Sequence, residues 1–126
     1  MAKLRLTEEL ALQFVGGLLK IVRSDDVVGP TESMALQRIL EATLEQPVDI
    51  AEAMFTHVTA DSLAKAIHDQ GAANRQAATS PPREVAERFV EAATAVADAA
   101  GGLAAREVNL INRYALALGV DGIGQG

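Results

Sequence analysis

The stretch that decides the fold is TEELALQFVGGLLKIV, residues 7–22. Its apolar residues recur at steps of three and four, the spacing that places side chains on one face of an α-helix. They are Leu10, Ala11, Phe14, Val15, Leu18, Leu19 and Val22. Thr7 is positioned to cap the start of this helix, and Glu8 and Glu9 follow at the positive end of its dipole. The stretch predicts an amphipathic helix with one buried face.

Gly16 and Gly17 lie inside this predicted helix. Each glycine costs a helix interior about 1 kcal/mol relative to alanine. Because a glycine lets another backbone or side chain come close, the pair predicts that a neighbouring helix packs tightly here.

Further helical patterns follow, separated by breaker residues. We expect helices from Pro30 to just before Pro47, over 49–58, over 59–69, from Ser80 onward, and from Ala105 to a stop at Gly119. Residues 71–82 read as a loop, and no segment alternates with the period of a strand. The fold class is therefore all-α: a compact bundle of about five to seven helices. Residues 1–120 form a single domain, and the Gly-rich tail, 121–126, is expected to be disordered.

Composition limits the kinds of partner. The net charge is −6, from 17 acidic and 11 basic residues, so we expect no nucleic-acid binding. The chain has no cysteine, which excludes disulfides and thiolate metal sites and fits a reducing compartment. No apolar run approaches the roughly 20 residues needed to cross a bilayer, and the N-terminus is too short and mixed for a signal peptide. We expect a cytoplasmic protein that does not insert into membranes.

Two stretches look alike at a shift of 75 positions, where Glu32 aligns with Glu107 and Arg38 with Arg113. Each consists of an apolar helix, a short acidic or glycine-containing turn, and a second helix opened by glutamate. Two such helix–turn–helix units predict a bundle with pseudo-twofold symmetry.

The turn regions resemble a known family. LLKIVRSDDVVGPTE (residues 18–32) and AVADAAGGLAARE (residues 95–107), with a stop at 118–120, are similar to the TerB-type tellurite-resistance domain. The resemblance covers roughly residues 8–120. It implies a compact helical domain of bacteria that serves in metal or envelope stress rather than in catalysis. It also implies that acidic turn residues hold a divalent cation.

The family carries, usually twice, an Asp-Gly turn with a glutamate seven residues after the aspartate. Asp25 and Glu32 match the first copy, with Asp26 in the place of the usual glycine. In the second copy Glu107 matches, Ala100 stands where the aspartate is expected, and Asp98 is the nearest substitute. The resemblance therefore implies a metal site made of Asp25, Asp26, Glu32, Asp98 and Glu107.

Calcium or magnesium suits such carboxylates better than zinc does. The other interpretation of these residues is ordinary helix-start chemistry, in which Glu32 and Glu107 cap helices and the aspartates solvate turns. The spacing is not that of an EF-hand loop.

His57 and His68 are the only histidines, and they lie in separate predicted helices. Their spacing does not match a zinc site, and a pairing of His57 with Asp61 one helical turn later accounts for that histidine. An enzyme that uses either histidine as a base would need both to converge on one pocket. No nucleophile elbow or phosphate-binding loop is present, so we expect no enzyme activity.

These observations leave two main hypotheses. The first is a non-enzymatic TerB-like stress-response module that binds a divalent cation and mediates protein contacts. The alternative is a metal-free interaction or scaffold domain, which self-associates or docks a partner helix through an exposed apolar helix face, for example around Leu63, Ile67 and the Ala-rich segments.

Overall fold

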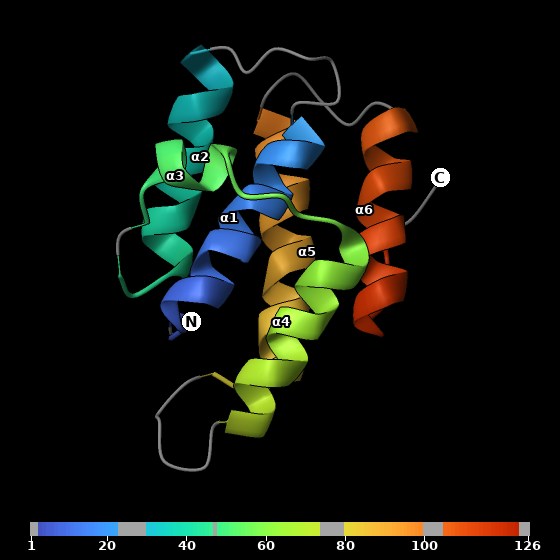
Figure 1. Ribbon diagram of the computed structural model, residues 1–126. Helices are drawn as coiled ribbons and strands as arrows, with labels where there is room; N and C mark the ends of the chain where they lie inside the picture. Colours follow the sequence, from blue (N-terminus) through green and yellow to red (C-terminus); the bar gives the residue numbers. More distant parts are fainter. Residues whose placement is uncertain (1–2, 23–29, 47, 74–79, 100–104, 124–126) are drawn as a thin grey trace.

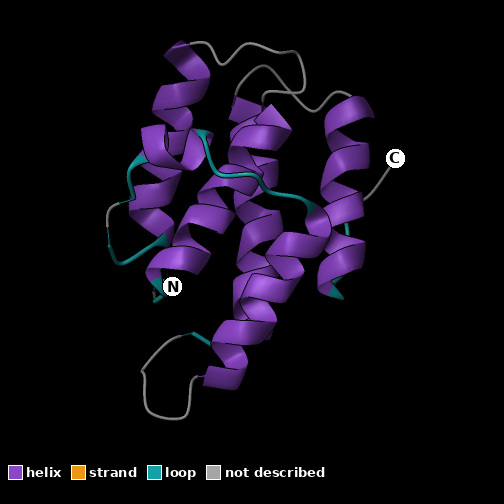
Figure 2. Cartoon of the chain, viewed as in Figure 1, coloured by secondary structure: helices purple, strands orange, loops and turns teal. Residues whose placement is uncertain are grey.

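The computed structural model describes residues 3–22, 30–46, 48–73, 80–99 and 105–123 (Figure 1). Within these ranges the chain forms six α-helices and no β-strand (Figure 2). They are α1 (Glu8–Val22), α2 (Pro30–Thr43), α3 (Ile50–Met54), α4 (Ala60–Ala73), α5 (Pro82–Ala99) and α6 (Ala105–Leu118). The all-α prediction is confirmed. In the described ranges no helix combines the length and apolar character that crossing a bilayer requires.

The helices form a bundle around α1 and α5, which lie side by side in its centre (Figure 1). Helices α2 and α3 lie on one side of this pair, and α4 and α6 on the other. Helices α1 and α5 run in one direction, and α2 and α6 return in the other. Both helix–turn–helix units therefore turn at the same end of the bundle, although their packing differs, because α6 lies against α5 and α4 whereas α2 packs chiefly on α5.

Three aromatic rings from three helices meet in the core. The rings of Phe14 in α1 and Phe89 in α5 lie edge to face, with centroids 5.2 Å apart. The Phe89 ring stacks on that of Tyr114 in α6, with centroids 5.4 Å apart. All three side chains are buried. Aromatic side chains bury large apolar areas. The cluster therefore holds α1, from the first half of the chain, against α5 and α6, from the second half.

The inward face predicted for α1 is buried as far as its side chains are described, and α5 and α6 each bury one apolar face as well. The buried side chains of these three helices include Leu10, Ala11, Phe14, Val15, Leu18 and Leu19 in α1, Val85, Phe89, Ala93, Val96 and Ala97 in α5, and Ile111, Tyr114 and Ala115 in α6.

The two glycines of α1 mark close contacts, as predicted. A Cβ atom on Gly16 would lie 2.7 Å from Val58 Cγ2 and 3.3 Å from the carbonyl oxygen of Ala53. A Cβ atom on Gly17 would lie 3.0 Å from the Phe89 ring. The neighbour at Gly17 is a helix, α5, whereas the neighbours at Gly16 are the end of α3 and the segment that follows it.

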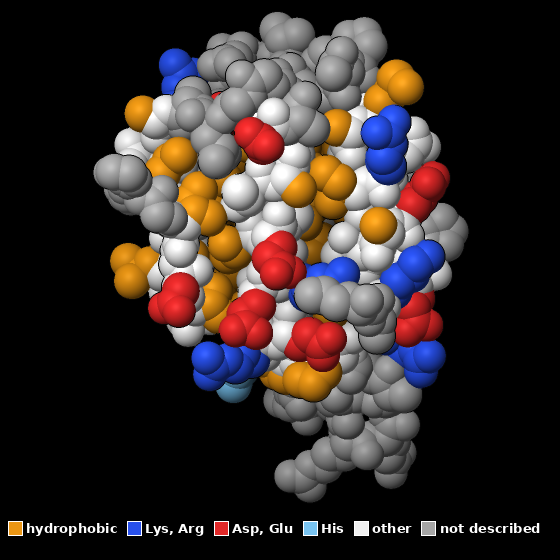
Figure 3. Space-filling view, turned by 180° about the vertical axis from the view of Figure 1, so that it is seen from behind, with side chains coloured by type: hydrophobic (Ala, Val, Ile, Leu, Met, Phe, Trp, Pro, Cys, Tyr) orange, Lys and Arg blue, Asp and Glu red, His pale blue; other side chains and the backbone are white. Residues whose placement is uncertain are grey.

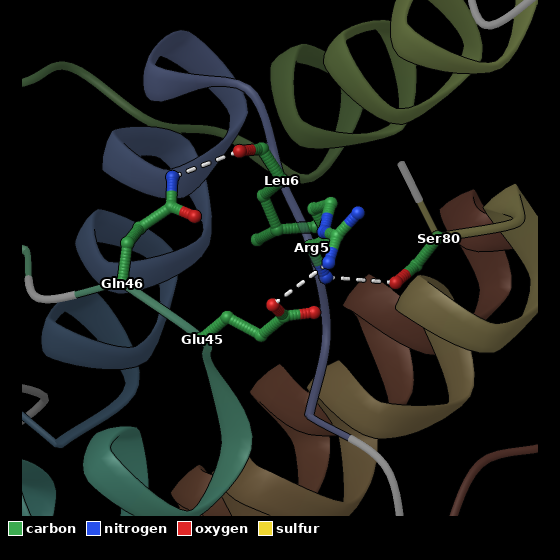
Figure 4. A network of polar contacts seen from close by, with 5 residues as sticks. All are labelled: Arg5, Leu6, Glu45, Gln46 and Ser80. Atoms are coloured by element: carbon green, nitrogen blue, oxygen red, sulfur yellow. Dashed lines mark hydrogen bonds and ion pairs between the residues drawn. The ribbon is translucent and has the colours of Figure 1, made fainter. Parts of the chain in front are cut away.

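The N-terminal segment ties several elements together, which the sequence did not predict. The Leu4 N–H donates to Thr43 O (2.6 Å), and the Glu45 N–H donates to Leu4 O (3.0 Å). Figure 4 shows the next contacts: Gln46 donates to the Leu6 carbonyl, and Arg5 forms an ion pair with Glu45 at 3.1 Å and bonds Ser80. The segment thus joins the end of α2 to the start of α5.

Several helix ends differ from the prediction. Helix α3 is shorter than the expected 49–58; Asp49 caps its start by accepting bonds from the N–H groups of Ala51 (3.0 Å) and Glu52 (3.3 Å). Helix α4 runs past Gly71, which was expected to break it. At its start, Thr59 and Ser62 exchange backbone-to-side-chain hydrogen bonds of 2.8 and 3.0 Å, a capping box with serine in place of the usual glutamate.

The exposed apolar face predicted around Leu63 and Ile67 is wrong. Leu63 is fully buried and Ile67 is 5% exposed, because α4 turns this face toward α1.

At the C-terminus, Gly119 has a φ of +74°, the left-handed conformation expected of a glycine helix stop. The tail expected to be disordered from residue 121 lies against α6 over residues 121–123, where the Ile123 N–H donates to Asn112 Oδ1 at 2.8 Å. Residues 124–126 lie outside the described ranges.

Candidate functional site

Three of the five predicted metal ligands, Glu32, Asp98 and Glu107, fall in described helices. Asp25 and Asp26 lie outside the described residues. Glu32 falls in the first turn of α2, where the backbone but not the side chain is described. Asp98 is exposed in the last turn of α5, and Glu107 is half-buried in the first turn of α6.

Figure 1 shows that the end of α5 and the starts of α2 and α6 lie at this same end. The fold therefore brings Glu32, Asp98 and Glu107 to one end of the molecule, although 75 positions separate the two glutamates. In the described part of the chain, no group of three or more His, Asp or Glu side chains is close enough to hold a metal ion. A cation site at this end would need carboxylates from residues 25, 26 or 32.

Glu107 and Asp98 lie at opposite ends of their helix dipoles. A glutamate in the first turn of a helix, as at Glu107, is stabilised by the positive end of the helix dipole. Asp98 is placed at the negative end of α5, and the last turn of that helix carries no basic residue. A carboxylate and the unpaired carbonyls of a helix C-terminus repel each other, and a bound cation would relieve that repulsion.

The two histidines do not come together. His57 is exposed in the segment between α3 and α4 and borders a hollow with Gly16 and Met54. His68 is exposed on α4 and borders a different hollow, with Pro82 and Val120. The shared pocket that a histidine-based enzyme requires is therefore not formed by these two residues.

Tyr114 has an unusual environment that the sequence pattern did not reveal. The residue is 2% exposed, and among the described residues its hydroxyl has no hydrogen-bond partner. Burial raises the pKa of this phenol above its ordinary value of 10.0, and the charge of Arg113 opposes the shift. The only signal in the sequence was the inward position of Tyr114 on α6, which predicts burial but not whether the hydroxyl finds a partner.

One face of the molecule is acidic along α5 (Figure 3). Glu87, Glu91 and Asp98 are exposed there, and Glu84 is half-buried. Arg83 lies 3.5 Å from Glu87 and Arg88 lies 3.6 Å from Glu91, so part of this charge is paired along the helix. Such a face repels a polyanion and favours basic groups or cations.

The family model described as tellurite resistance protein TerB matches residues 11–123. Neither the curated proteins nor the solved structures give a significant match. The matched region spans α1 to α6 and includes all five predicted metal ligands. TerB is not a known enzyme family. The chain therefore belongs to the TerB family of tellurite resistance proteins.

Proposed function

We propose that this chain is a non-enzymatic stress-response module of the bacterial cytoplasm, which contributes to tellurite or metal resistance. In this proposal it binds a divalent cation at the end of the bundle where both helix–turn–helix units turn, and the bound cation controls a contact with another protein. The family supports the link to tellurite. The site residues are Asp25, Asp26, Glu32, Asp98 and Glu107.

The observation that carries the cation proposal is the position of Asp98. Its carboxylate lies at the negative end of α5, with no basic residue in that turn, and at the end of the bundle where α2 and α6 begin with Glu32 and Glu107. Glu32 is distant in the sequence from Asp98 and Glu107, and the helix ends that carry the three residues lie at one end of the bundle.

The chemistry of the donors favours calcium or magnesium. Carboxylate oxygens are the ligands that these hard cations prefer. Zinc prefers histidine and thiolate ligands, but the chain has no cysteine and its two histidines lie elsewhere.

The test is a thermal melt of chelator-treated protein, repeated with calcium, magnesium, manganese or zinc. A ligand that binds only the native state adds about 2.7 kcal/mol at a hundredfold excess over its dissociation constant. We expect one cation to raise the melting temperature by several degrees, and Glu32→Gln or Asp98→Asn to reduce that rise.

The matched control is Glu41→Gln, since Glu41 is exposed in the last turn of α2, at the other end of that helix. It should leave the rise unchanged. A flat response to all four cations would reject the cation site and leave the metal-free interaction domain as the function.

That second candidate has an observation of its own. Phe55 is 91% exposed and Leu116 is 81% exposed, although both are large apolar side chains. Exposed apolar surface of this kind marks sites of protein contact when it is contiguous.

A further inference from the structure

One hollow of the molecule is bordered by three helices. It has a volume of about 450 Å³ and lies where the end of α1, the start of α4 and the second half of α6 meet. The segment that joins α3 to α4 passes across α1 and brings the start of α4 to this place (Figure 1). Ligand pockets commonly have volumes of about 300–1,000 Å³, and in helical bundles they lie between the helices.

Most of the wall of this hollow is apolar. Its apolar residues are Ala60 in α4 and Leu110, Leu116 and Ala117 in α6. Tyr114, which is 2% exposed, belongs to the same wall. Such a wall suits the apolar part of a small molecule, because binding removes the apolar surfaces of both from water.

Two cationic side chains border the hollow from different helices. Lys20 belongs to the last turn of α1, and Arg113 belongs to α6. The Lys20 Nζ donates to the carbonyl oxygen of Val58 at 3.0 Å. An ammonium group has three donors, so this bond holds the group beside the hollow and leaves two donors for a ligand. In the described part of the chain, no carboxylate forms an ion pair with Arg113.

The charge around the hollow is opposite in sign to that of the chain. The whole chain carries a net charge of −6, but the described border of the hollow has Lys20 and Arg113 against one acidic residue, Asp61. A larger hollow beside α5, of about 560 Å³, has the reverse balance, with four acidic residues and two arginines. An anionic group is therefore attracted to the hollow between α1, α4 and α6.

We propose that this hollow binds a small organic anion, a molecule with an apolar body and one carboxylate. The apolar body packs against the wall formed by α4 and α6, and the cations of the border, Arg113 and Lys20, hold the carboxylate. A guanidinium group pairs with a carboxylate through two parallel hydrogen bonds, so Arg113 orients the ligand. Asp61 disfavours a second negative charge on the ligand. The inference adds a ligand site to the proposed function and does not depend on cation binding.

Tyr114 reports directly on the occupancy of this hollow. It lines the hollow, and it is the only tyrosine of a chain that has no tryptophan. A change in the intrinsic fluorescence of the protein on addition of a transparent ligand therefore comes from this wall.

The experiment is a titration of the full chain with hexanoate, at constant ionic strength and without divalent cations, followed by tyrosine fluorescence and by calorimetry. We expect saturable binding with a Kd of about 1 mM, a level typical of a ligand with so few atoms. Hexanamide has the same shape without the charge, and inorganic phosphate has the charge without the apolar body. Each should bind roughly tenfold more weakly than hexanoate, because each lacks one of the two kinds of contact.

Variants of exposed residues locate the binding. Arg113→Gln removes a charged donor and should weaken hexanoate binding roughly tenfold. The matched control is Arg38→Gln, since Arg38 aligns with Arg113 at the shift of 75 positions and is exposed on α2, but does not border this hollow. It should leave the Kd unchanged. Leu116→Asp places an anion on the wall and should abolish binding; Leu116 is 81% exposed, so the change leaves the core intact.

Four results would overturn the proposal: no saturable binding of hexanoate, equal affinities for hexanoate and hexanamide, phosphate binding as tight as that of hexanoate, or an Arg113→Gln variant that binds hexanoate like the wild type. Melting temperatures of the variants without ligand verify that each is folded. Because these titrations contain no divalent cation, none of their results bears on the cation site, and the melts with added cations do not bear on the hollow.

Discussion

The main chain of Arg5 and the start of α5 are joined by a reciprocal pair of hydrogen bonds between Arg5 and Ser80. The Arg5 N–H donates to Ser80 Oγ at 2.8 Å, and the Ser80 N–H donates to Arg5 O at 2.9 Å. Gln70, from α4, completes the junction: its Oε1 accepts from the Thr7 N–H at 2.7 Å, and its Nε2 donates to Ser80 O at 3.4 Å. Three segments distant in sequence therefore meet at one buried glutamine.

Replacing that glutamine should destabilise the fold. Gln70 is 5% exposed, so Gln70→Ala removes two hydrogen bonds from a protected place. We expect the free energy of unfolding to fall by about 1–3 kcal/mol, the cost of leaving buried polar groups unpaired. Urea denaturation measures it. Gln37→Ala, at an exposed position of α2, should change stability little, and an equal loss in both variants would contradict the role of Gln70.

Phe89 should be the most sensitive core residue, because it touches both other rings of the aromatic cluster. Phe89→Ala leaves a cavity between α1 and α6 and should cost about 3–5 kcal/mol. The control, Phe55→Ala, changes the same side chain in solvent and should have almost no effect when the chain is monomeric. Comparable losses in the two variants would show that Phe55 is packed.

Gly16→Ala and Gly17→Ala should both destabilise the protein, although alanine favours a helix by about 1 kcal/mol. Gly16→Ala should lower the free energy of unfolding more than Gly17→Ala does. Its Cβ atom would press on the Ala53 carbonyl as well as on Val58, and a backbone group moves less easily than a side chain. The control is Asn109→Ala, at an exposed position of α6. It changes only the helix propensity, without a close contact, and should stabilise the protein slightly. Thermal melts of the three variants test the order, and a stabilising Gly16→Ala would refute the close contact.

Tyr114 should make stability fall in alkali. The pKa of its phenol is raised by burial, so the folded state holds the proton at pH values where the unfolded state has released it. The protonated phenol therefore contributes to the free energy of unfolding. This contribution is fully present below the pKa of the phenol in the unfolded state, about 10, and is lost as the pH rises through the pKa in the folded state.

Tyr114→Phe should abolish that alkaline loss and, by removing an unpaired buried hydroxyl, raise the free energy of unfolding near neutral pH by about 1 kcal/mol. Tyr114 is the only tyrosine and there is no tryptophan, so the tyrosinate absorbance follows this group alone. A titration midpoint at or below the ordinary tyrosine value would contradict the raised pKa.

The sequence determined the local structure of this protein. The three-and-four spacing in residues 7–22 predicted α1, its buried face and the Thr7 cap, whose Oγ1 accepts from the Leu10 N–H at 3.3 Å. Gly119 predicted the end of α6, and the turn motifs predicted the TerB family. The helix, its cap and the helix stop depend on residues a few positions apart, so helix geometry connects them to the sequence, whereas the family follows from the resemblance of the turn motifs.

Only the tertiary structure decided which faces meet. Leu63 and Ile67 were expected in solvent, but α4 packs them inward, whereas Phe55 and Leu116 remain outside with no pattern in the sequence to distinguish them. The junction of Arg5, Gln70 and Ser80 likewise joins distant segments, and the end of α5 and the starts of α2 and α6 lie at one end of the bundle. A periodic pattern specifies a face of one helix; which neighbour covers that face depends on how all six helices pack together.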